Sequence, residues 1–184
     1  DFDEATEYCG YPNNKVVIKP RVGRGSRGVL IMDPETRDFQ RLLPDRLCGV
    51  GPKSEIKKIL NSKKLGFTRL ICMPFLEGPV FDVDCIVKDG ELLNCVSRVR
   101  QLKNPLSPFS TGHKVELNST VIEYAEKICH TMCMDGAADF DIIIEQTSGK
   151  PILLDAGARF SGSVGGTYVA GGNFLTQLIR SKMG

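Results

Sequence analysis

Short apolar runs rich in β-branched residues alternate with polar turn residues along most of the chain. Runs of this kind, bounded by Gly, Pro, Asn or Asp, are typical of β-strands. The sequence therefore predicts strands at 16–18, 29–32, 68–73, 80–87, 91–99, 138–145 and 151–155. Short turns at 88–90 and 146–150 join the last four of these strands into two expected hairpins.

Apolar residues spaced three and four apart predict helices in three places. One follows Ser54, a candidate N-cap, and another follows Thr120, which forms a capping-box pattern with Glu123. The third covers residues 174–179. Helices placed between hairpins favour an α+β fold with antiparallel sheets over the strict βαβ alternation of a parallel fold.

Composition and charge narrow the class of protein. The 184 residues are 41% hydrophobic and 25% charged, which is the ordinary mix of a globular protein and excludes a disordered tail or a fibre. A net charge of +2 and the absence of Trp argue against nucleic acid as a partner. No apolar run approaches the roughly 18 residues of a membrane-spanning helix, so we expect no membrane partner.

The cysteines indicate a reducing compartment. There are seven, and no two form a CxxC pair. Cys129 and Cys133 flank His130, but a structural zinc site needs four ligands, so reduced thiols in a cytoplasmic protein are the favoured interpretation. The acidic start of the chain has no secretory pattern, and the lack of an initial Met suggests a part of a longer protein.

A glycine-rich loop is the first candidate for chemistry. Gly23-x-Gly25-x-x-Gly28 matches the dinucleotide fingerprint, but that fingerprint needs a helix directly after it, and a strand is predicted at 29–32. Lys19 precedes this loop, and the loop segment carries Ser26 and the three arginines Arg21, Arg24 and Arg27. Cations beside free backbone amides suit a phosphate. A basic hairpin on the surface is the alternative interpretation.

Two acidic residues are the second candidate. In a hairpin centred on Ser148, Asp141 opposes Asp155, and paired residues have Cβ atoms about 4.5–5.5 Å apart on one face of the sheet. Two carboxylates so placed repel unless a cation lies between them, and Mg²⁺ or Mn²⁺ suits such oxygen ligands. A slipped register or a solvated pair is the alternative. Arg159 follows the second strand and could hold a transferred phosphoryl group, or be an ordinary surface arginine.

Three stretches taken in order resemble the ATP-grasp superfamily. They cover residues 16–29, 73–84 and 138–163. The resemblance is to the branch that contains the carbamoyl-phosphate synthase large chain and related carboxylate–amine ligases. It implies an ATP-grasp fold of two lobes, at about 14–75 and 76–184, whose antiparallel sheets enclose ATP.

The resemblance also implies roles for individual residues. Lys19 and Arg21 would contact the phosphates, and the loop with Gly23, Gly25, Ser26 and Gly28 would fold over them. The adenine hinge and the ribose contact would come from Met73, Phe75, Leu76 and Asp82. Asp141 and Asp155 would bind Mg²⁺ or Mn²⁺, and Arg159 would steady the transferred phosphate. Arg98 and Arg100 fall near basic positions that face the phosphates or the acceptor in some relatives.

In such ligases ATP converts a carboxylate into an acylphosphate, which an amine or similar nucleophile attacks. The partners implied are therefore ATP and a small carboxylate substrate. The resemblance also implies an amino-terminal domain of the same polypeptide as a partner, which we expect to be missing from this chain, and a homodimer is a further option.

The chain departs from the family pattern in the metal strand. The usual Glu-x-Asn is replaced by Asp155-Ala-Gly157, which removes one ligand side chain. In the register above Asp139 opposes Gly157 and could stand in for the asparagine. Two alternatives therefore stay open: a nucleotide-binding module that has lost catalysis, and an interaction domain that binds no nucleotide.

Overall fold

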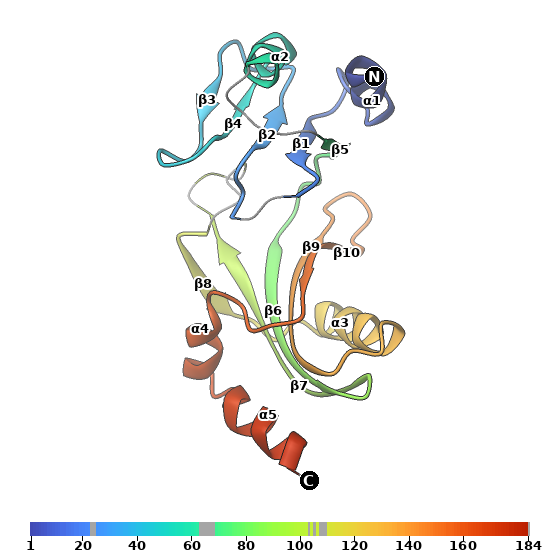
Figure 1. Ribbon diagram of the computed structural model, residues 1–184, viewed down its shortest axis with the longest axis vertical. Coiled ribbons are helices and arrows are strands. Elements are labelled where there is room, and N and C mark those ends of the chain that lie inside the picture. The colour runs from blue at the N-terminus through green and yellow to red at the C-terminus, as the bar shows by residue number, and fades with distance from the viewer. Residues whose placement is uncertain (23–24, 63–68, 103, 105, 107–109, 184) are drawn as a thin grey trace. The chain divides into compact units, whose positions relative to one another are not determined.

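The chain forms two five-stranded sheets, each with its own helices, in a computed structural model that describes residues 1–22, 25–62, 69–102, 104, 106 and 110–183 (Figure 1). It divides into two compact units, one built mainly from Asp1–Phe75 and the other mainly from residues 76–183. Strand pairing is antiparallel except between two strands of the first sheet. The predicted α+β class is confirmed.

The first sheet has the strand order β3-β4-β2-β1-β5. Its strands are β1 (Val16–Pro20), β2 (Val29–Met32), β3 (Gln40–Arg41), β4 (Cys48–Gly51) and β5 (Leu70–Pro74). β2 and β4 form the parallel pair. The strands predicted at 16–18 and 29–32 are confirmed, and the one predicted at 68–73 runs over Leu70–Pro74, with its first residue outside the described residues. The sequence did not predict β3 and β4.

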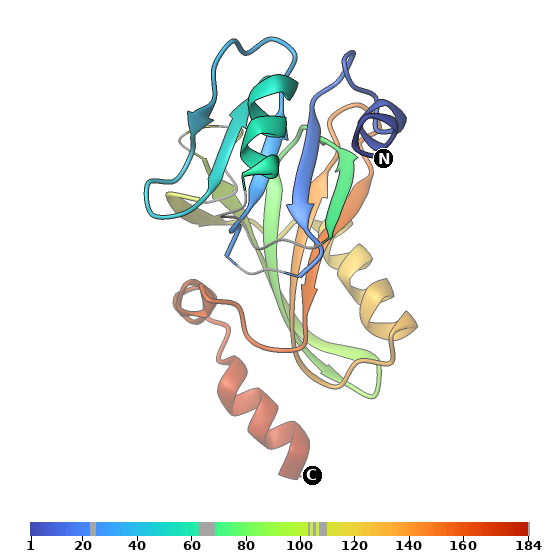
Figure 2. The ribbon, with the colours of Figure 1, turned by 45° about the horizontal axis from the view of Figure 1, so that its top comes forward.

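Two helices accompany this sheet, α1 (Phe2–Tyr8) and α2 (Lys53–Asn61). Alternate residues of β1 and β2 point to one face, where they form a core with Ile56 of α2. The strand residues of this core are Val16, Ile18, Leu30 and Met32. Figure 2 shows α2 lying across this face of the sheet.

Both N-caps predicted from the sequence are wrong by two residues. The N-cap of α2 is Pro52, and Ser54 lies inside the helix. In α3 (Ser119–Thr131) the N-cap is Asn118, whose side chain accepts a hydrogen bond from the Val121 backbone N–H at 3.1 Å. Asn is as good a cap as Thr, and here it is the residue with extended backbone that the position needs.

The second sheet has the order β10-β9-β6-β7-β8 and is antiparallel throughout. Its strands are β6 (Val80–Lys88), β7 (Glu91–Gln101), β8 (Gly112–Val115), β9 (Gly136–Ile144) and β10 (Pro151–Gly157). Both predicted hairpins are confirmed. Between β6 and β7, Asp89 and Gly90 have φ of 51° and 84°, as a tight hairpin turn requires.

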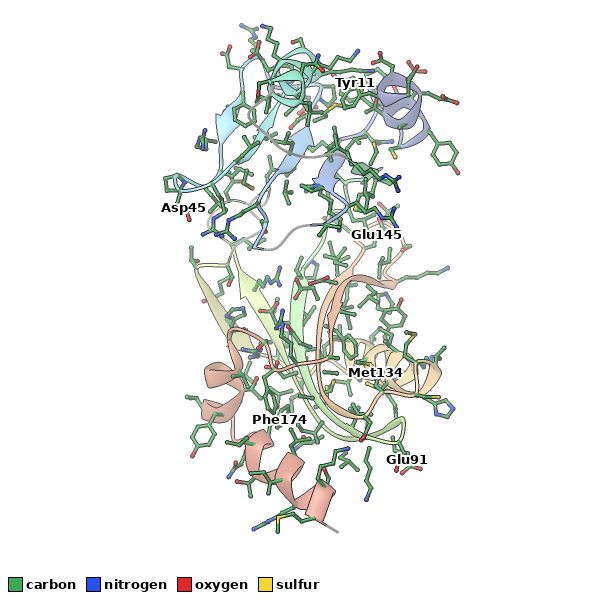
Figure 3. The ribbon with its side chains drawn as sticks, in the orientation of Figure 1. Tyr11, Asp45, Glu91, Met134, Glu145 and Phe174 are labelled. Atoms are coloured by element: carbon green, nitrogen blue, oxygen red, sulfur yellow. The ribbon has the colours of Figure 1, made fainter. Side chains whose placement is uncertain are left out.

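Helices lie on both faces of the second sheet. On one face α3 packs against a core that includes Phe81, Phe140 and Ile142. Cys85 and Cys129 belong to the same core, and all seven cysteines are free. On the other face are α4 (Val164–Val169) and α5 (Phe174–Met183). Phe174, labelled in Figure 3, packs there with Ile86 and Val96, the apolar end of a face that is otherwise charged.

No helix in the described part of the chain is both long and apolar enough to cross a membrane.

Candidate functional site

One row of charged residues crosses four strands of the second sheet. Asp155 of β10 is paired with Asp141 of β9, which is paired with Asp82 of β6, and Asp82 is paired with Arg98 of β7. Paired residues of antiparallel strands point to the same face. The neighbouring rows add further charged residues to this charged face, namely Asp139, Asp84, Arg100 and His113.

The predicted pairing of Asp141 with Asp155 is confirmed, although the hairpin is not regular. Near the turn Pro151 is paired with Ile144, one residue out of the symmetric register. A β-bulge between Leu153 and Asp155 then shifts the register so that Asp155 meets Asp141. The extra residue is what brings the two carboxylates to one face, because a shift of one residue reverses the face of every following side chain.

The innermost element of the charged face is a buried ion pair. Arg98 Nη2 donates to Asp84 Oδ2 at 2.6 Å, and the two side chains are 1% and 0% exposed. Asp84 also accepts hydrogen bonds from the Ser161 N–H and from the hydroxyls of Ser161 and Thr167. Arg98 Nη1 donates to the Ser163 carbonyl. The pair therefore fixes the segment after β10 onto the sheet.

Arg100 is the second cation of this face and contacts two carboxylates. Its Nε donates to Asp82 Oδ1 and its Nη2 lies 2.6 Å from Asp141 Oδ2, both at ion-pair distance. The other oxygen of Asp82 is paired with His113 Nε2. Both oxygens of Asp82 are thus in ion pairs, whereas among the described residues Asp141 forms an ion pair with Arg100 alone.

Arg159 lies at the end of β10, beside Asp139. Its Nη1 is 2.9 Å from Asp139 Oδ2 and also donates to the Phe160 carbonyl. Gly157 is paired with Asp139 as predicted, and a Cβ at Gly157 would lie 3.6 Å from the Arg159 side chain. That distance is an ordinary van der Waals contact, so the position has room for a small side chain. The carboxylate opposite the missing asparagine binds the Arg159 guanidinium in this structure.

Negative charge is in excess on the charged face. Burial and the neighbouring carboxylates of Asp84 and Asp141 raise the pKa of Asp139 to about 6, although Arg159 opposes the shift. Burial also raises the pKa of Asp141, against the opposing effect of Arg100. For Asp82 burial acts in the same direction, but Arg100 and His113 outweigh it and the pKa lies below its usual value.

These residues fit a divalent cation that is also bound by phosphate. Among the described residues no group of three or more His, Cys, Asp or Glu side chains is arranged to hold a metal alone. Mg²⁺, however, is commonly held by one or two carboxylates together with water and substrate phosphates. Asp141 and Asp155 supply two carboxylates on one face. Burial is the main cause of the raised pKa of Asp141 and the Asp82 carboxylate adds to it, so a cation bound here would stabilise the charged form of Asp141.

The first unit places Lys19 beside an apolar strip. Lys19 and Val17 point to the face of β1 opposite the α2 core, since Val16 and Ile18 belong to that core. Val17 is paired with Ile31 of β2 on one side and with Met73 of β5 on the other. An apolar row next to the Lys19 cation suits a ligand with a flat apolar part and an anionic part.

The glycine-rich loop lies between the strands β1 and β2, as predicted, and part of its described backbone is left-handed. Gly25, Ser26 and Gly28 have φ of 59°, 54° and 80°, the left-handed region that glycine adopts at little cost. The Gly25 carbonyl accepts a hydrogen bond from Arg46 Nη1 at 2.8 Å. Gly23 lies outside the described residues. Arg21, next to β1, is exposed.

The predicted hinge residues lie where the two units meet in sequence. Met73 is in β5, and the Phe75 backbone N–H donates to the Lys15 carbonyl at 3.0 Å. Leu76 is the first residue of the second unit.

Several residues on or beside the charged face were not predicted. His113 lies on β8, a strand that was not predicted, and Ser161 and Thr167 lie in a glycine-rich stretch without alternation. A signal was present in β7, where Arg98 and Arg100 alternate with the apolar Val99 and so had to share a face.

Comparison with known proteins identifies the class to which this fold belongs. Residues 66–184 match the family described as "ATP-grasp in the biosynthetic pathway with Ter operon". The match covers more than half of the chain, and the protein belongs to the ATP-grasp family. The predicted membership is confirmed, while the predicted likeness to carbamoyl-phosphate synthase is a distant one.

Individual relatives agree with this assignment. Dapdiamide A synthase from Enterobacter agglomerans is 25% identical over 170 residues, which are 87% of this chain and 37% of the relative. D-alanine–D-alanine ligase from Bacillus anthracis, in complex with ATP, has a TM-score of 0.57 at 20% identity, over 100% of this chain and 56% of that one. L-amino acid ligase from Bacillus licheniformis has a TM-score of 0.56 at 18% identity, over 89% of this chain and 37% of that one. The chain thus spans between about a third and three fifths of these proteins' lengths.

Proposed function

We propose that this chain is the nucleotide-binding part of an ATP- and Mg²⁺-dependent ligase that joins a carboxylate to an amine or similar nucleophile. The observation that carries the proposal is the pairing of Asp141 with Asp155 on a sheet face where five carboxylates meet three guanidinium groups. Family membership supports it, as do the printed activities of the relatives, which are ligases and a synthase.

The reaction has two steps in this proposal. A carboxylate oxygen of the substrate attacks the γ-phosphorus of ATP, which forms an acylphosphate and releases ADP. The nucleophile then attacks the acyl carbon, phosphate leaves, and the nucleophile loses a proton. Both steps shift negative charge between phosphate oxygens, so positioned cations lower the barrier.

We assign the following roles to the chain's own residues. Asp141 and Asp155 would hold the Mg²⁺, which neutralises charge on the phosphates when it is bound. Arg159 would hold the transferred phosphoryl group. To do so, its guanidinium would leave Asp139 and bind the phosphate instead. The phosphates would contact Lys19, Arg21 and the loop with Gly23, Gly25, Ser26 and Gly28, and adenine would contact Met73, Phe75 and Leu76. Asp82 has both oxygens in ion pairs, so we assign to it the orientation of Arg100 rather than a ribose contact.

Thermal unfolding with and without ligands tests the proposal. ATP with Mg²⁺ at about 100 times its dissociation constant should raise the midpoint of unfolding by roughly 5–10 °C, because it binds only the native state. Without Mg²⁺ the rise should be much smaller. In Asp141→Asn the rise should no longer depend on Mg²⁺, because the variant lacks a metal ligand. A rise that ignores the metal in the wild type would favour a non-catalytic nucleotide-binding module, and no rise at all would favour an interaction domain.

The role of Lys19 gives a separate prediction. Lys19→Ala should weaken ATP binding about 10- to 100-fold, the value of a charge-assisted hydrogen bond to phosphate. Isothermal titration calorimetry measures the dissociation constant. Lys58→Ala is the matched control, because it removes the same charge from an exposed ion pair on α2 of the same unit. Equal dissociation constants for Lys19→Ala and this control would remove Lys19 from its assigned role.

A further inference from the structure

Arg100 contacts the proposed metal ligand Asp141 directly. One guanidinium contacts both Asp82 and Asp141, with its Nη2 at 2.5 Å from Asp82 Oδ1 and at 2.6 Å from Asp141 Oδ2. The Arg100 side chain is 17% exposed, so water screens these contacts only in part. Arginine does not lose its proton in proteins, and this competition for Asp141 therefore persists at every working pH.

A free divalent ion meets two unequal ligands at this place. Asp155 is exposed, and among the described residues its carboxylate makes no hydrogen bond or ion pair. Asp141 can bind the ion fully only if the contact with Arg100 is broken, which would leave a half-buried guanidinium with one partner fewer. A single exposed carboxylate is a weak site for Mg²⁺, which gives up its water reluctantly.

A metal ion that arrives on a triphosphate changes this balance. Its phosphate oxygens supply the remaining metal ligands, and they also offer the guanidinium a new anionic partner of matching geometry. We propose that Arg100 is a specificity-determining residue: it keeps Asp141 from binding free divalent ions, so that the site accepts a metal–nucleotide complex. This inference rests on the proposed function, since it takes Asp141 as a metal ligand.

The other arginines of the charged face cannot take this role. Arg98 is fully buried, and its partner Asp84 is also bound by Ser161 and Thr167. Arg159 is 62% exposed and contacts Asp139, with no contact to Asp141 among the described residues. Arg100 alone among the three contacts the predicted metal ligand directly.

Binding of Mn²⁺ to the 184-residue chain tests the inference, with electron paramagnetic resonance as a measure of the free ion. Wild-type protein should bind Mn²⁺ weakly by itself and tightly with a non-hydrolysable ATP analogue. Arg100→Gln frees Asp141 and should bind Mn²⁺ alone at least about tenfold more tightly than the wild type, the scale on which neighbours of a ligand change metal affinity. Adding Asp141→Asn to Arg100→Gln should abolish that gain.

Lys114→Gln is the matched control, because it removes the same charge from β8 on the other face of the sheet, at a side chain 70% exposed. It should bind Mn²⁺ as the wild type does. Arg100→Lys keeps the charge but cannot bridge two carboxylates in the same way, and should show a smaller gain; it replaces Arg100→Gln if that variant does not fold.

The outcomes separate the two proposals. If Mn²⁺ binds with the analogue but Arg100→Gln and Arg100→Lys show no gain for free Mn²⁺, the role of Arg100 is wrong and the proposed function stands. A gain of equal size in Lys114→Gln would also overturn it, because general electrostatics would then explain the effect. If Mn²⁺ does not bind even with the analogue, the metal site itself fails, and the role of Arg100 fails with it.

Discussion

Replacing Arg98 by Met is expected to lower the free energy of unfolding of the second unit by about 3–5 kcal/mol. The substitution leaves the Asp84 carboxylate fully buried without its counter-ion, and a buried uncompensated charge is one of the costliest defects a fold can carry. Urea unfolding followed by far-ultraviolet circular dichroism measures the change. A loss below about 1 kcal/mol, the range of an exposed pair, would contradict the expectation.

Two further variants isolate the cause of that loss. Lys58→Met breaks an ion pair of the same 2.6 Å length in which the lysine is 72% exposed, and it should change stability little. Asp84→Asn combined with Arg98→Met should cost less than Arg98→Met alone, because the stranded charge is gone. If the double variant is the less stable of the two, lost packing around Arg98 and not the buried charge is responsible.

The sequence predicts those parts of the fold that depend on residues close to one another along the chain. Both hairpins of the second sheet follow from alternation and from turns such as Asp89-Gly90, whose positive φ angles are typical of a tight turn. The helix α1 was not predicted, although Asp1 and Glu4 form a capping box at its start, which is a local signal in the sequence.

The strand β4 shows what local patterns cannot supply. Its sequence, Cys48–Gly51, contains two glycines and one β-branched residue, which is not typical of a strand. Gly49 lies so close to Phe39 that no side chain would fit, and the parallel pairing with β2 provides the hydrogen bonds. Packing against Phe39 and pairing with β2 therefore determine this strand, and neither can be recognised from the residues of β4 alone.

The candidate site was predictable within a hairpin but not between hairpins. The pairing of Asp141 with Asp155 was predicted from a symmetric hairpin, but the structure reaches it through a turn one residue out of that register and a β-bulge, which has no signal in the sequence. The contacts of Arg100 depend on β6 lying between β7 and β9, a pairing of strands about 60 residues apart in sequence. The alternation of polar and apolar residues predicts the face of the sheet on which each side chain lies. The residues that it contacts there depend on the order of the strands, which alternation does not predict.

Replacing Asp139 by Asn is expected to stabilise the protein at neutral pH and to flatten its pH dependence. The pKa of Asp139 is about 6 in the folded protein, against 3.8 as the usual value, so the folded state binds a proton more tightly than the unfolded state does. Stability from this group is therefore complete below about pH 4 and is lost as the pH rises through 6.

The size and the control of this effect follow from the groups around Asp139. A shift of this size corresponds to about 3 kcal/mol, which screening by water reduces to roughly 1–2 kcal/mol, and the pair with the exposed Arg159 offsets little. In urea unfolding without metal, Asp139→Asn should gain that amount at pH 7.5 and nothing at pH 4. Asp135→Asn is the control of opposite sign, because Lys182 lowers the pKa of Asp135 and the variant should gain no stability at pH 7.5. The contrary result would be a difference in free energy of unfolding between the wild type and Asp139→Asn that is the same at pH 4 and at pH 7.5. Asp139 would then lack the burial and the neighbouring negative charge that raise its pKa.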